Sequence, residues 1–361
     1  MSIKDIKETE LEEIDQTEVF KCDSCGSSMV FNPETQTLKC VHCGSKVSFK
    51  NEIANELNLS EGLSQDKFWE RDKNSCFRCE SCGAQVVFAV GESAKKCPFC
   101  LTSHVVKEQT FLGLKPNAVV PFSFDVKKGV LFSKNWAKKR FFAPRNFKKN
   151  INCENVSGVY APNFTFDSAT TSYYVGEIGK THTRVIGSGK NRRVETYVVW
   201  RKISGTYNTS FDDVLISAGD KLGQKELDKI SPFSTNESKV YNETYLSGYM
   251  AYQYDNELSL CWGQAKQRMD KVIKRNILSK YSYDKLAYIN VSTKHTDVKY
   301  KYVMLPVYVG SYTFKKRNYN FYVNGSTGKV YGKTPKSIFK IFLTIALGVC
   351  TLAGIILLST M

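Results

Sequence analysis

Eight of the twelve cysteines occur as four CxxC pairs, and they are the residues of this chain best suited to chemistry. The pairs are Cys22–Cys25, Cys40–Cys43, Cys79–Cys82 and Cys97–Cys100. Fourteen residues separate the two pairs of each set, and the second set repeats the first with an offset of 57 residues. Val30–Phe31 and Lys39 recur at the same offset as Val87–Phe88 and Lys96. This pattern indicates an internal duplication.

The CxxC spacing predicts metal ligation, because two intervening residues let a tight turn direct both sulfurs at one point. Gly26, Gly44 and Gly83 follow three of the pairs and suit a backbone with positive φ, whereas Leu101 follows the fourth. Two such turns joined by a hairpin enclose four thiolates, which suit Zn²⁺ and leave no open coordination position. We therefore expect two zinc ions, one in each ribbon. A rubredoxin-like iron centre or a redox dithiol would use the same spacing, and Cys76 adds a further CxxC step whose role is open.

The other candidate chemical residues favour structural roles. His42 lies between two predicted ligands and is expected to point outward, while Cys153, Cys261 and Cys350 are isolated and suit core or membrane packing. Gly187-Ser-Gly-Lys190 lacks the spacing of a phosphate-binding loop and predicts a hairpin tip. The sequence contains no GxSxG, HExxH or nucleotide-binding motif, and its four histidines suggest no catalytic pairing. We expect a protein that is not an enzyme, although an unrecognised site in the β-rich part is a third hypothesis.

A long apolar stretch from Ile338 to Leu358 predicts a transmembrane helix. Its 21 residues would form a helix of about 31 Å, enough to cross a hydrocarbon core of roughly 30 Å. Lys333, Lys336 and Lys340 lie on the entry side, so the positive-inside rule predicts a cytosolic N-terminal part and a single-pass protein of the cell membrane. The alternative is a buried core helix.

The charge distribution suggests anionic partners. Residues 1–18 hold seven acids and two lysines and so have a net charge of −5. Because the whole chain has a net charge of +16, the remaining residues have a net charge of +21. The composition of residues 1–18 predicts a disordered acidic arm, and this arm contains no apolar signal peptide. Eight thiolates with two Zn²⁺ would lower the net charge to about +12. The excess suits an anionic membrane surface or nucleic acid.

A basic and aromatic segment, residues 127–149, contains nine Lys and Arg and no acid. Its aromatic residues are Phe132, Trp136, Phe141, Phe142 and Phe147. Such a segment could contact lipid head groups, with Lys138, Lys139 and Arg140 as the contacts, or it could contact nucleic acid. The alternative is a helix that packs its aromatic face on a sheet while its lysines are solvated.

The remaining pattern predicts an α+β fold with antiparallel sheets. A helix is expected over 126–142 and another over 256–280, the latter with an apolar core-facing side. Strand-like runs fill 156–166, 172–178, 193–200, 214–217 and several segments of 286–331. The predicted units are the arm (1–18), ribbon 1 (19–50), a helical linker (51–75), ribbon 2 (76–108), an α+β cytosolic domain (115–333) and the transmembrane anchor (338–358).

Two C-terminal stretches, Leu305–Tyr312 and Tyr319–Gly332 with Pro335–Ser337, resemble bacterial membrane proteins described as containing a TFIIB-type zinc ribbon. Further matching landmarks are Phe142–Pro144, Gly158–Tyr160, Phe211–Leu215 and Tyr254–Asp255. This chain departs from the pattern in its two ribbons, in Cys76 and in Asn163–Phe164, where a bulkier apolar pair is expected. Members are sometimes labelled relatives of the primosomal helicase, and some are linked to phage-shock-type envelope-stress systems as anchors for partner proteins.

Together, these features predict a tail-anchored, cytosol-facing adaptor that docks protein partners through its ribbons, with a role in envelope stress implied by the resemblance. The alternative is a membrane-tethered zinc-ribbon protein that binds nucleic acid without helicase activity. Because thiolate ligation makes the ribbons less basic, and because the anchor would hold the chain where lipid is at high local concentration, we expect nucleic acid to be the weaker partner.

Overall fold

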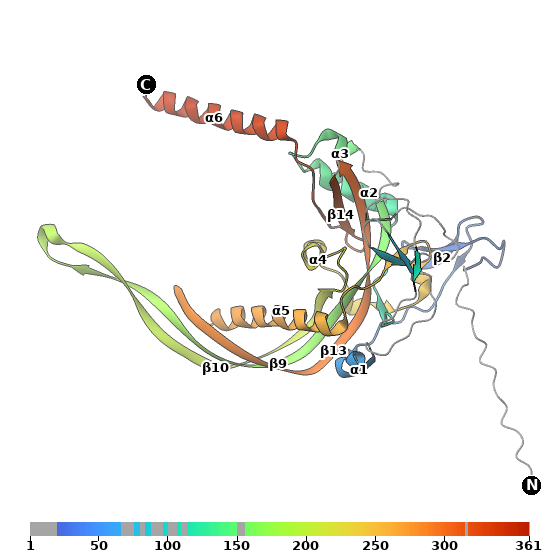
Figure 1. Ribbon diagram of the computed structural model, residues 1–361, viewed down its shortest axis with the longest axis horizontal. Coiled ribbons are helices and arrows are strands. Elements are labelled where there is room, and N and C mark those ends of the chain that lie inside the picture. Colours follow the sequence, from blue (N-terminus) through green and yellow to red (C-terminus); the bar gives the residue numbers. More distant parts are fainter. Residues whose placement is uncertain are drawn as a thin grey trace, which may run out of the picture.

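The computed structural model describes residues 20–65, 76–79, 84–87, 97–99, 107–109, 114–149, 156–314 and 317–360. The predictions for the acidic arm, Cys82, Cys100 and Cys153 lie outside these ranges. The described fold is α+β, with a large sheet built around three long strands: β9 (Val156–Ile186), β10 (Arg193–Ser217) and β13 (Lys285–Phe314). β9 lies between the other two and pairs antiparallel with both. The β9–β10 hairpin extends beyond the rest of the sheet (Figure 1).

These strands are continuous where the sequence predicted several shorter ones. Predicted breaks such as 201–210 in β10 are paired without interruption, and two of the breaks contain β-bulges, at Asp212–Asp213 in β10 and at Asp297–Val298 in β13. Asp213 and Asp297 have φ of 49° and 50°, a conformation that aspartate tolerates better than most residues. The predicted hairpin tip is confirmed, because 187–192 joins β9 to β10 through the short 3₁₀ turn η2 (Gly189–Asn191).

The helix α5 (Leu258–Leu278) packs on the concave side of the curved sheet (Figure 1). Its fully buried residues are Leu258, Cys261, Ala265, Met269, Ile273 and Ile277. These positions recur at helical spacing, so one stripe of the helix covers the sheet while the lysines and arginines face outward. This confirms the predicted core helix and the packing role of Cys261.

The N-terminal part contributes a separate three-stranded sheet: β1 (Met29–Asn32), β2 (Thr37–Cys40) and β3 (Lys46–Val47). The range predicted as a helical linker is helical only in part of its described residues, because residues 51–58 contain no helix. The short strand β4 (Leu57–Asn58) pairs with β13, and only α1 (Leu59–Gln65) is helical. Residues 66–75 lie outside the described ranges. The segment is tied to the large sheet by backbone pairing that its polar sequence does not reveal.

Shorter elements complete the described fold. They are β5 (Cys76–Arg78), β6 (Gln85–Val87), β7 (Lys107–Gln109), β8 (Ala118–Val119), α2 (Val126–Lys138), α3 (Arg145–Lys149), α4 (Gln224–Ile230), η3 (Thr235–Glu237), β11 (Lys239–Val240), η4 (Glu243–Leu246), β12 (Met250–Tyr252), β14 (Arg317–Asn324) and β15 (Val330–Gly332). Asp125 caps α2 as predicted, accepting a hydrogen bond from the backbone N–H of Lys128 at 2.9 Å. The helix ends at Lys138, four residues before the predicted end at 142.

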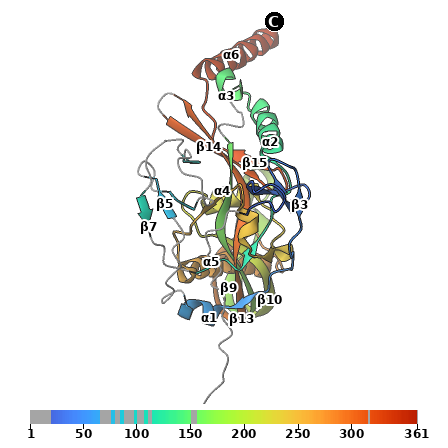
Figure 2. The same ribbon diagram turned by 90° about the vertical axis from the view of Figure 1, so that its right-hand side faces the viewer.

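The C-terminal helix α6 (Ile338–Thr360) lies at the opposite end of the molecule from α1 (Figure 1 and Figure 2). Its stretch Ile338–Ile356 is long and apolar enough to cross a membrane, and no part of it is buried by the rest of the chain. Its first turn is fixed to the body, because Lys340 Nζ donates to the carbonyls of Phe141 and Ala143, both at 2.9 Å.

Candidate metal centre

Ribbon 1 is built on the β1–β2 hairpin, which brings its two CxxC pairs together. The antiparallel register places Met29 opposite Cys40, so the second pair begins where the hairpin returns to the first. Asn32 shapes the connecting turn, with its side-chain oxygen accepting from the N–H groups of Glu34 and Thr35 at 2.9 and 3.2 Å. This hairpin turn therefore brings together cysteines that are 15 and 21 positions apart in the sequence.

Each CxxC pair forms a knuckle closed by the same backbone bond. The N–H of Cys22 donates to the carbonyl of Ser27, and that of Cys40 to the carbonyl of Ser45, both at 2.8 Å. Gly26 and Gly44 adopt φ of 70° and 77° inside these turns, as the sequence predicted.

The four sulfurs of ribbon 1 gather around one point. The Sγ atoms of Cys22 and Cys43 lie 3.4 Å apart and those of Cys25 and Cys40 lie 3.5 Å apart. All four lie within 4.8 Å of one another. A tetrahedral zinc site with Zn–S bonds of about 2.3 Å requires sulfurs about 3.8 Å apart. The donor set and its spacing therefore fit a thiolate-bound metal ion such as Zn²⁺.

Backbone donors around this cluster favour the thiolate form that binds metal. The N–H groups of His42 and Cys43 point at the Cys40 sulfur at 3.4 and 3.5 Å. The backbone N–H of Ser24 lowers the pKa of Cys22, and that of Ser27 lowers the pKa of Cys25. Hydrogen bonds to thiolates stabilise the charged form, and metal binding requires deprotonated thiols.

The two remaining ligands differ in their proton affinity. The hydroxyl of Ser45 lowers the pKa of Cys43. For Cys40, the N–H of Cys43 acts to lower the pKa, but burial and the hydrogen bond with Cys25 outweigh it and raise the pKa. Cys22 and Cys40 are buried, whereas Cys25, Cys43 and His42 are exposed. His42 is not part of the four-sulfur group, in agreement with its predicted outward position.

The described part of ribbon 2 repeats the backbone geometry of ribbon 1. The N–H of Cys79 donates to the carbonyl of Ala84 at 2.8 Å, five residues ahead, as Cys22 does to Ser27. Arg78 pairs with Gln85, as Lys21 pairs with Ser28 at the equivalent positions. Cys79 and Cys97 are buried in one apolar cluster. Because Cys82 and Cys100 lie outside the described residues, the second metal site remains a prediction.

Both ribbons are attached to the large sheet by residues that the sequence analysis did not identify. Phe31 of ribbon 1 is buried against Tyr245 at a ring-centroid distance of 5.2 Å, and the Ser247 hydroxyl donates to the carbonyl of Met29 at 2.7 Å. In the second set, Phe99 packs against Tyr252 at 5.4 Å. These partners are distant in sequence and carry no local signal of their role.

Ser311 completes the attachment of the second set. It is buried in β13 and donates toward the carbonyls of Pro98 and Phe99 at 3.0 and 3.1 Å. A buried hydroxyl normally requires such partners, so Ser311 holds the Cys97 turn against the sheet.

A second group of ionisable side chains lies where both bulges face β9. Carboxylate oxygens of Glu56, Asp167 and Asp212 lie within 4.8 Å of one another. Lys301, almost fully buried, lies 2.9 Å from Asp213 and 3.8 Å from Glu56. The Lys301 ammonium group compensates the negative charge of these carboxylates, so the group is best described as a partly buried ion network. It assigns a structural role to the Phe211–Leu215 landmark, whose two aspartates form the bulge.

The comparisons with known proteins give one distant relative. The chain is 29% identical over 231 residues to the uncharacterized protein YdjG of Bacillus subtilis (strain 168), covering 63% of this chain and 66% of YdjG. No family model matches the chain, and no solved structure matches it. What the site and fold define is a class: an α+β protein with a four-cysteine group that could hold a metal ion and one helix that could span a membrane.

Proposed function

We propose that this chain is a membrane-anchored adaptor that binds partner proteins through two zinc ribbons and turns over no substrate. The observation that carries this proposal is the four-sulfur group of ribbon 1, fixed on a packed domain. Four thiolates fill the coordination shell of Zn²⁺ and leave no position for a substrate, so the metal would stabilise the fold that presents the ribbon. The repeated backbone of the second set supports one ion per ribbon.

The outer side of ribbon 1 is the proposed partner-binding surface. Phe31 faces the core, whereas Val41 and Val47 on the same ribbon are 66% and 42% exposed. Val41 lies inside the second knuckle, between Cys40 and Cys43, so its position is fixed by the sulfur cluster. A rigid knuckle with an exposed aliphatic side chain suits a small protein interface, because little side-chain entropy is lost on binding.

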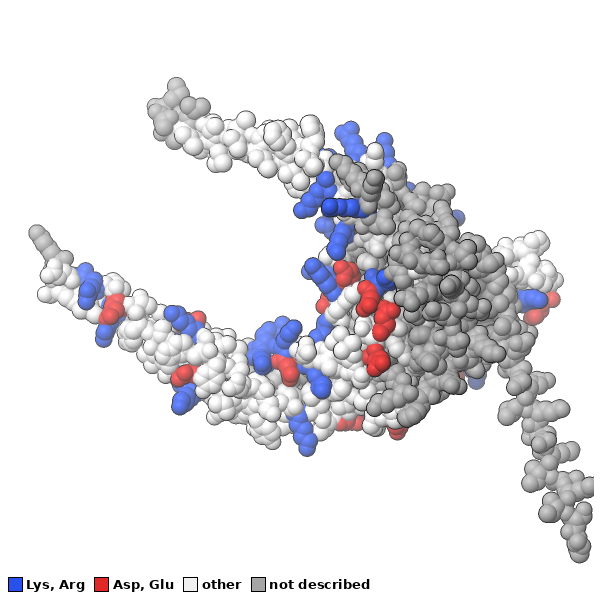
Figure 3. Space-filling view, in the orientation of Figure 1, with Lys and Arg blue, Asp and Glu red and all other residues white. Residues whose placement is uncertain are grey.

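The basic and aromatic segment supports an additional contact with anionic lipid. Trp136 and Phe147 are buried in the core, whereas Phe141 and Phe142 are 61% and 41% exposed beside the start of α6. Aromatic and basic residues at the entry to a transmembrane helix typically lie at the lipid head groups. Lys138, Lys139 and Arg140 are exposed at the same place. Figure 3 shows Lys and Arg side chains gathered near the start of α6.

Residues 127–149 therefore combine the two alternatives considered for them, packing on the sheet and contact with lipid. Part of their aromatic face packs on the sheet, and the exposed remainder lies next to the proposed anchor. With the lysines before α6 on the inner side, the ribbons would face the cytosol. A role in envelope stress rests only on the family resemblance of the C-terminal stretches.

Photo-crosslinking in intact cells tests the adaptor proposal. A crosslinking amino acid placed at Ser24, which is exposed beside the cluster, should capture a discrete protein partner. Val41→Asp should reduce that capture at least tenfold while leaving the zinc content unchanged. Val194→Asp is the matched control, because Val194 is 68% exposed on the distant β9–β10 hairpin. Capture that is indifferent to Val41→Asp would contradict the proposed surface, and capture of nucleic acid would favour the rival function.

A further inference from the structure

A basic cleft of about 560 Å³ lies between α4 and α5, and its described lining includes no ribbon residue. Its charged lining consists of Lys225, Lys229, Arg268, Lys271 and a single carboxylate, Asp228. The side-chain amides of Gln264 and Gln267 also line it, and Ile216 is its apolar contribution. Lys and Arg side chains gather over these helices, in the hollow between the β9–β10 hairpin and α6 (Figure 3). The cleft therefore carries a local excess of positive charge that neither the ribbons nor the anchor explains.

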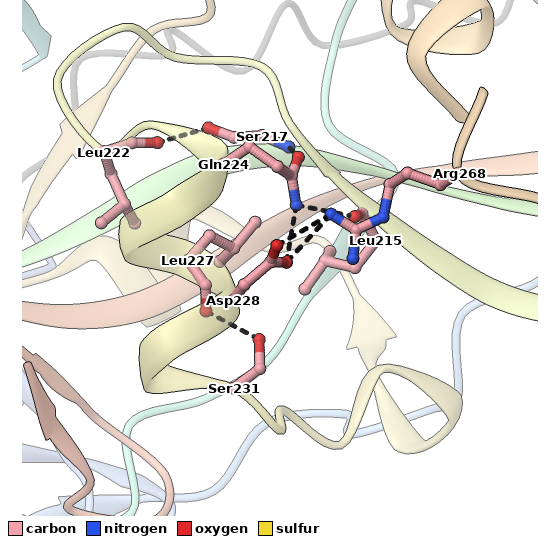
Figure 4. Close-up of polar contacts among 8 residues, drawn as sticks. All are labelled: Leu215, Ser217, Leu222, Gln224, Leu227, Asp228, Ser231 and Arg268. Carbon is pink, nitrogen blue, oxygen red and sulfur yellow. Dashed lines mark hydrogen bonds and ion pairs between the residues drawn. The ribbon is translucent and has the colours of Figure 1, made fainter. Parts of the chain in front are cut away.

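Arg268 is held in position by a chain of hydrogen bonds to the end of β10 (Figure 4). Its Nη1 donates to both carboxylate oxygens of Asp228, at 3.0 and 3.1 Å. Asp228 also accepts from Gln224 Nε2 at 2.9 Å, and Gln224 Oε1 accepts from the backbone N–H of Ser217 at 2.9 Å. The guanidinium is thus attached through two side chains to the backbone of the sheet.

This network orients a donor and adds little to stability. The Arg268 and Asp228 side chains are 38% and 45% exposed, and exposed ion pairs typically contribute less than about 1 kcal/mol. Among the described residues, Asp228 accepts the only hydrogen bonds of the guanidinium, all from Nη1. Nε and Nη2 are left as donors, and a planar guanidinium with two adjacent donors matches the oxygens of a phosphate.

The remaining lining narrows the ligand class. The three lysines supply point charges that neutralise an anionic phosphate group, and the amides of Gln264 and Gln267 suit hydroxyl groups. Among the residues that the structure describes, the lining offers no aromatic ring on which a nucleobase could stack. The volume lies within the usual range of small-molecule sites and exceeds that of a free phosphate ion.

We propose that the α4–α5 cleft binds a phosphate ester of a small polyol, with Arg268 as its principal phosphate ligand and Asp228 as the residue that positions Arg268. Two sources share this chemistry: a soluble compound such as glycerol 3-phosphate, and the head group of a glycerophospholipid in the membrane to which α6 would attach the chain. No ribbon residue takes part in this site, so the test of the site does not depend on the adaptor proposal.

Calorimetric titration of the full chain tests the site. Zinc-loaded protein in phosphatidylcholine nanodiscs should bind sn-glycerol 3-phosphate saturably, and glycerol itself should not bind. Arg268→Gln should weaken binding at least tenfold. Arg275→Gln is the control, since Arg275 is exposed on the same helix outside the cleft and its loss should leave the affinity unchanged.

Asp228→Asn separates an oriented site from a merely positive surface. The substitution removes a negative charge, so a surface acting by charge alone would bind more tightly. If Asp228 positions Arg268, binding should instead weaken several-fold, with the far-UV circular dichroism unchanged. Tighter binding by this variant would overturn the proposed role of the network.

Nanodiscs that contain phosphatidylglycerol distinguish the two sources. If the lipid head group reaches the cleft, it will compete and lower the apparent affinity for glycerol 3-phosphate in the wild type. Unchanged affinity would assign the cleft to a soluble ligand, and both results support the proposal. It is overturned if no saturable binding occurs in either nanodisc, or if Arg268→Gln binds like the wild type. Arg268-dependent binding of a synthetic acidic peptide of residues 1–18, without phosphate binding, would also overturn it.

Discussion

Asp167→Asn is expected to stabilise the folded chain at neutral and higher pH. Asp167 lies on β9 opposite both bulges and accepts a hydrogen bond from the backbone N–H of Asp213 at 2.7 Å. Burial, followed by the hydrogen bond with Glu56, raises the pKa of Asp167 to about 7. The same hydrogen bond lowers the pKa of Glu56. Asp167 is therefore the member of this pair that carries the shared proton, and asparagine reproduces that protonated form.

The size of the effect follows from the pKa difference. In the unfolded chain the carboxyl titrates near 3.8, so folding favours its protonated form by about three pKa units, or about 4 kcal/mol as an upper limit. Since Asp167 is only partly buried, solvent screening reduces this figure, and we take roughly half, about 2 kcal/mol. The stabilisation is complete below about pH 4 and is lost as pH rises to about 7. Asparagine does not titrate, so the variant should gain that amount relative to the wild type above pH 7.

Denaturant unfolding of the zinc-loaded chain between pH 5.5 and 8.5 measures this difference. The free energy of unfolding of Asp167→Asn minus that of the wild type should rise with pH up to about 7 and then level off. Taking the difference cancels the pH dependence of zinc binding, which both proteins share. Glu195→Gln is the control and should show no such rise, because it removes a carboxylate on the β9–β10 hairpin that is not part of the group around Asp167. A pH-independent difference, or a variant less stable than the wild type at pH 8, would refute the assignment of the proton to Asp167.

Cys40→Ser should remove the ion of ribbon 1, lowering the zinc content from the expected two ions to one by elemental analysis; retention of both would contradict the four-sulfur assignment. Gly310→Ala should destabilise the chain by about 1–3 kcal/mol in the same unfolding assay, because its Cβ would overlap the Phe321 ring. Gly263→Ala is its counterpart: no atom lies within 4 Å of the added Cβ, so a gain of up to about 1 kcal/mol is expected in helix α5. Changing Lys138, Lys139 and Arg140 to Glu should weaken contact with anionic lipid by about 1 kcal/mol per residue, seen as faster hydrogen exchange at 138–147 in phosphatidylglycerol nanodiscs and no change in phosphatidylcholine. Equal exchange in the two lipids would remove the lipid contact from the proposed function.

The cysteine knuckles and the C-terminal helix could be predicted from the sequence because both depend on short-range patterns. A CxxC turn places two sulfurs through two intervening residues and a glycine, so the ligand set of ribbon 1 follows from local spacing. The apolar run of α6 and the helical period of α5 are likewise properties of consecutive residues. The pairing of the two knuckles needed only one hairpin between them.

Tertiary structure decided the length of the strands and every contact between distant segments. The sequence placed breaks near the aspartates of β10 and β13, but neighbouring strands continue the backbone pairing past them, and each of these two breaks contains a bulge. Ser311 attaches the Cys97 turn through a hydrogen bond to Pro98, which lies 213 positions away in the sequence, and no local sequence pattern marks this contact. Arg268 and Asp228 are 40 positions apart, so the α4–α5 cleft exists only once the sheet brings two helices together. Turn and helix patterns are set by neighbours in the chain, whereas burial, shared protons and clefts depend on which surfaces meet in the folded state.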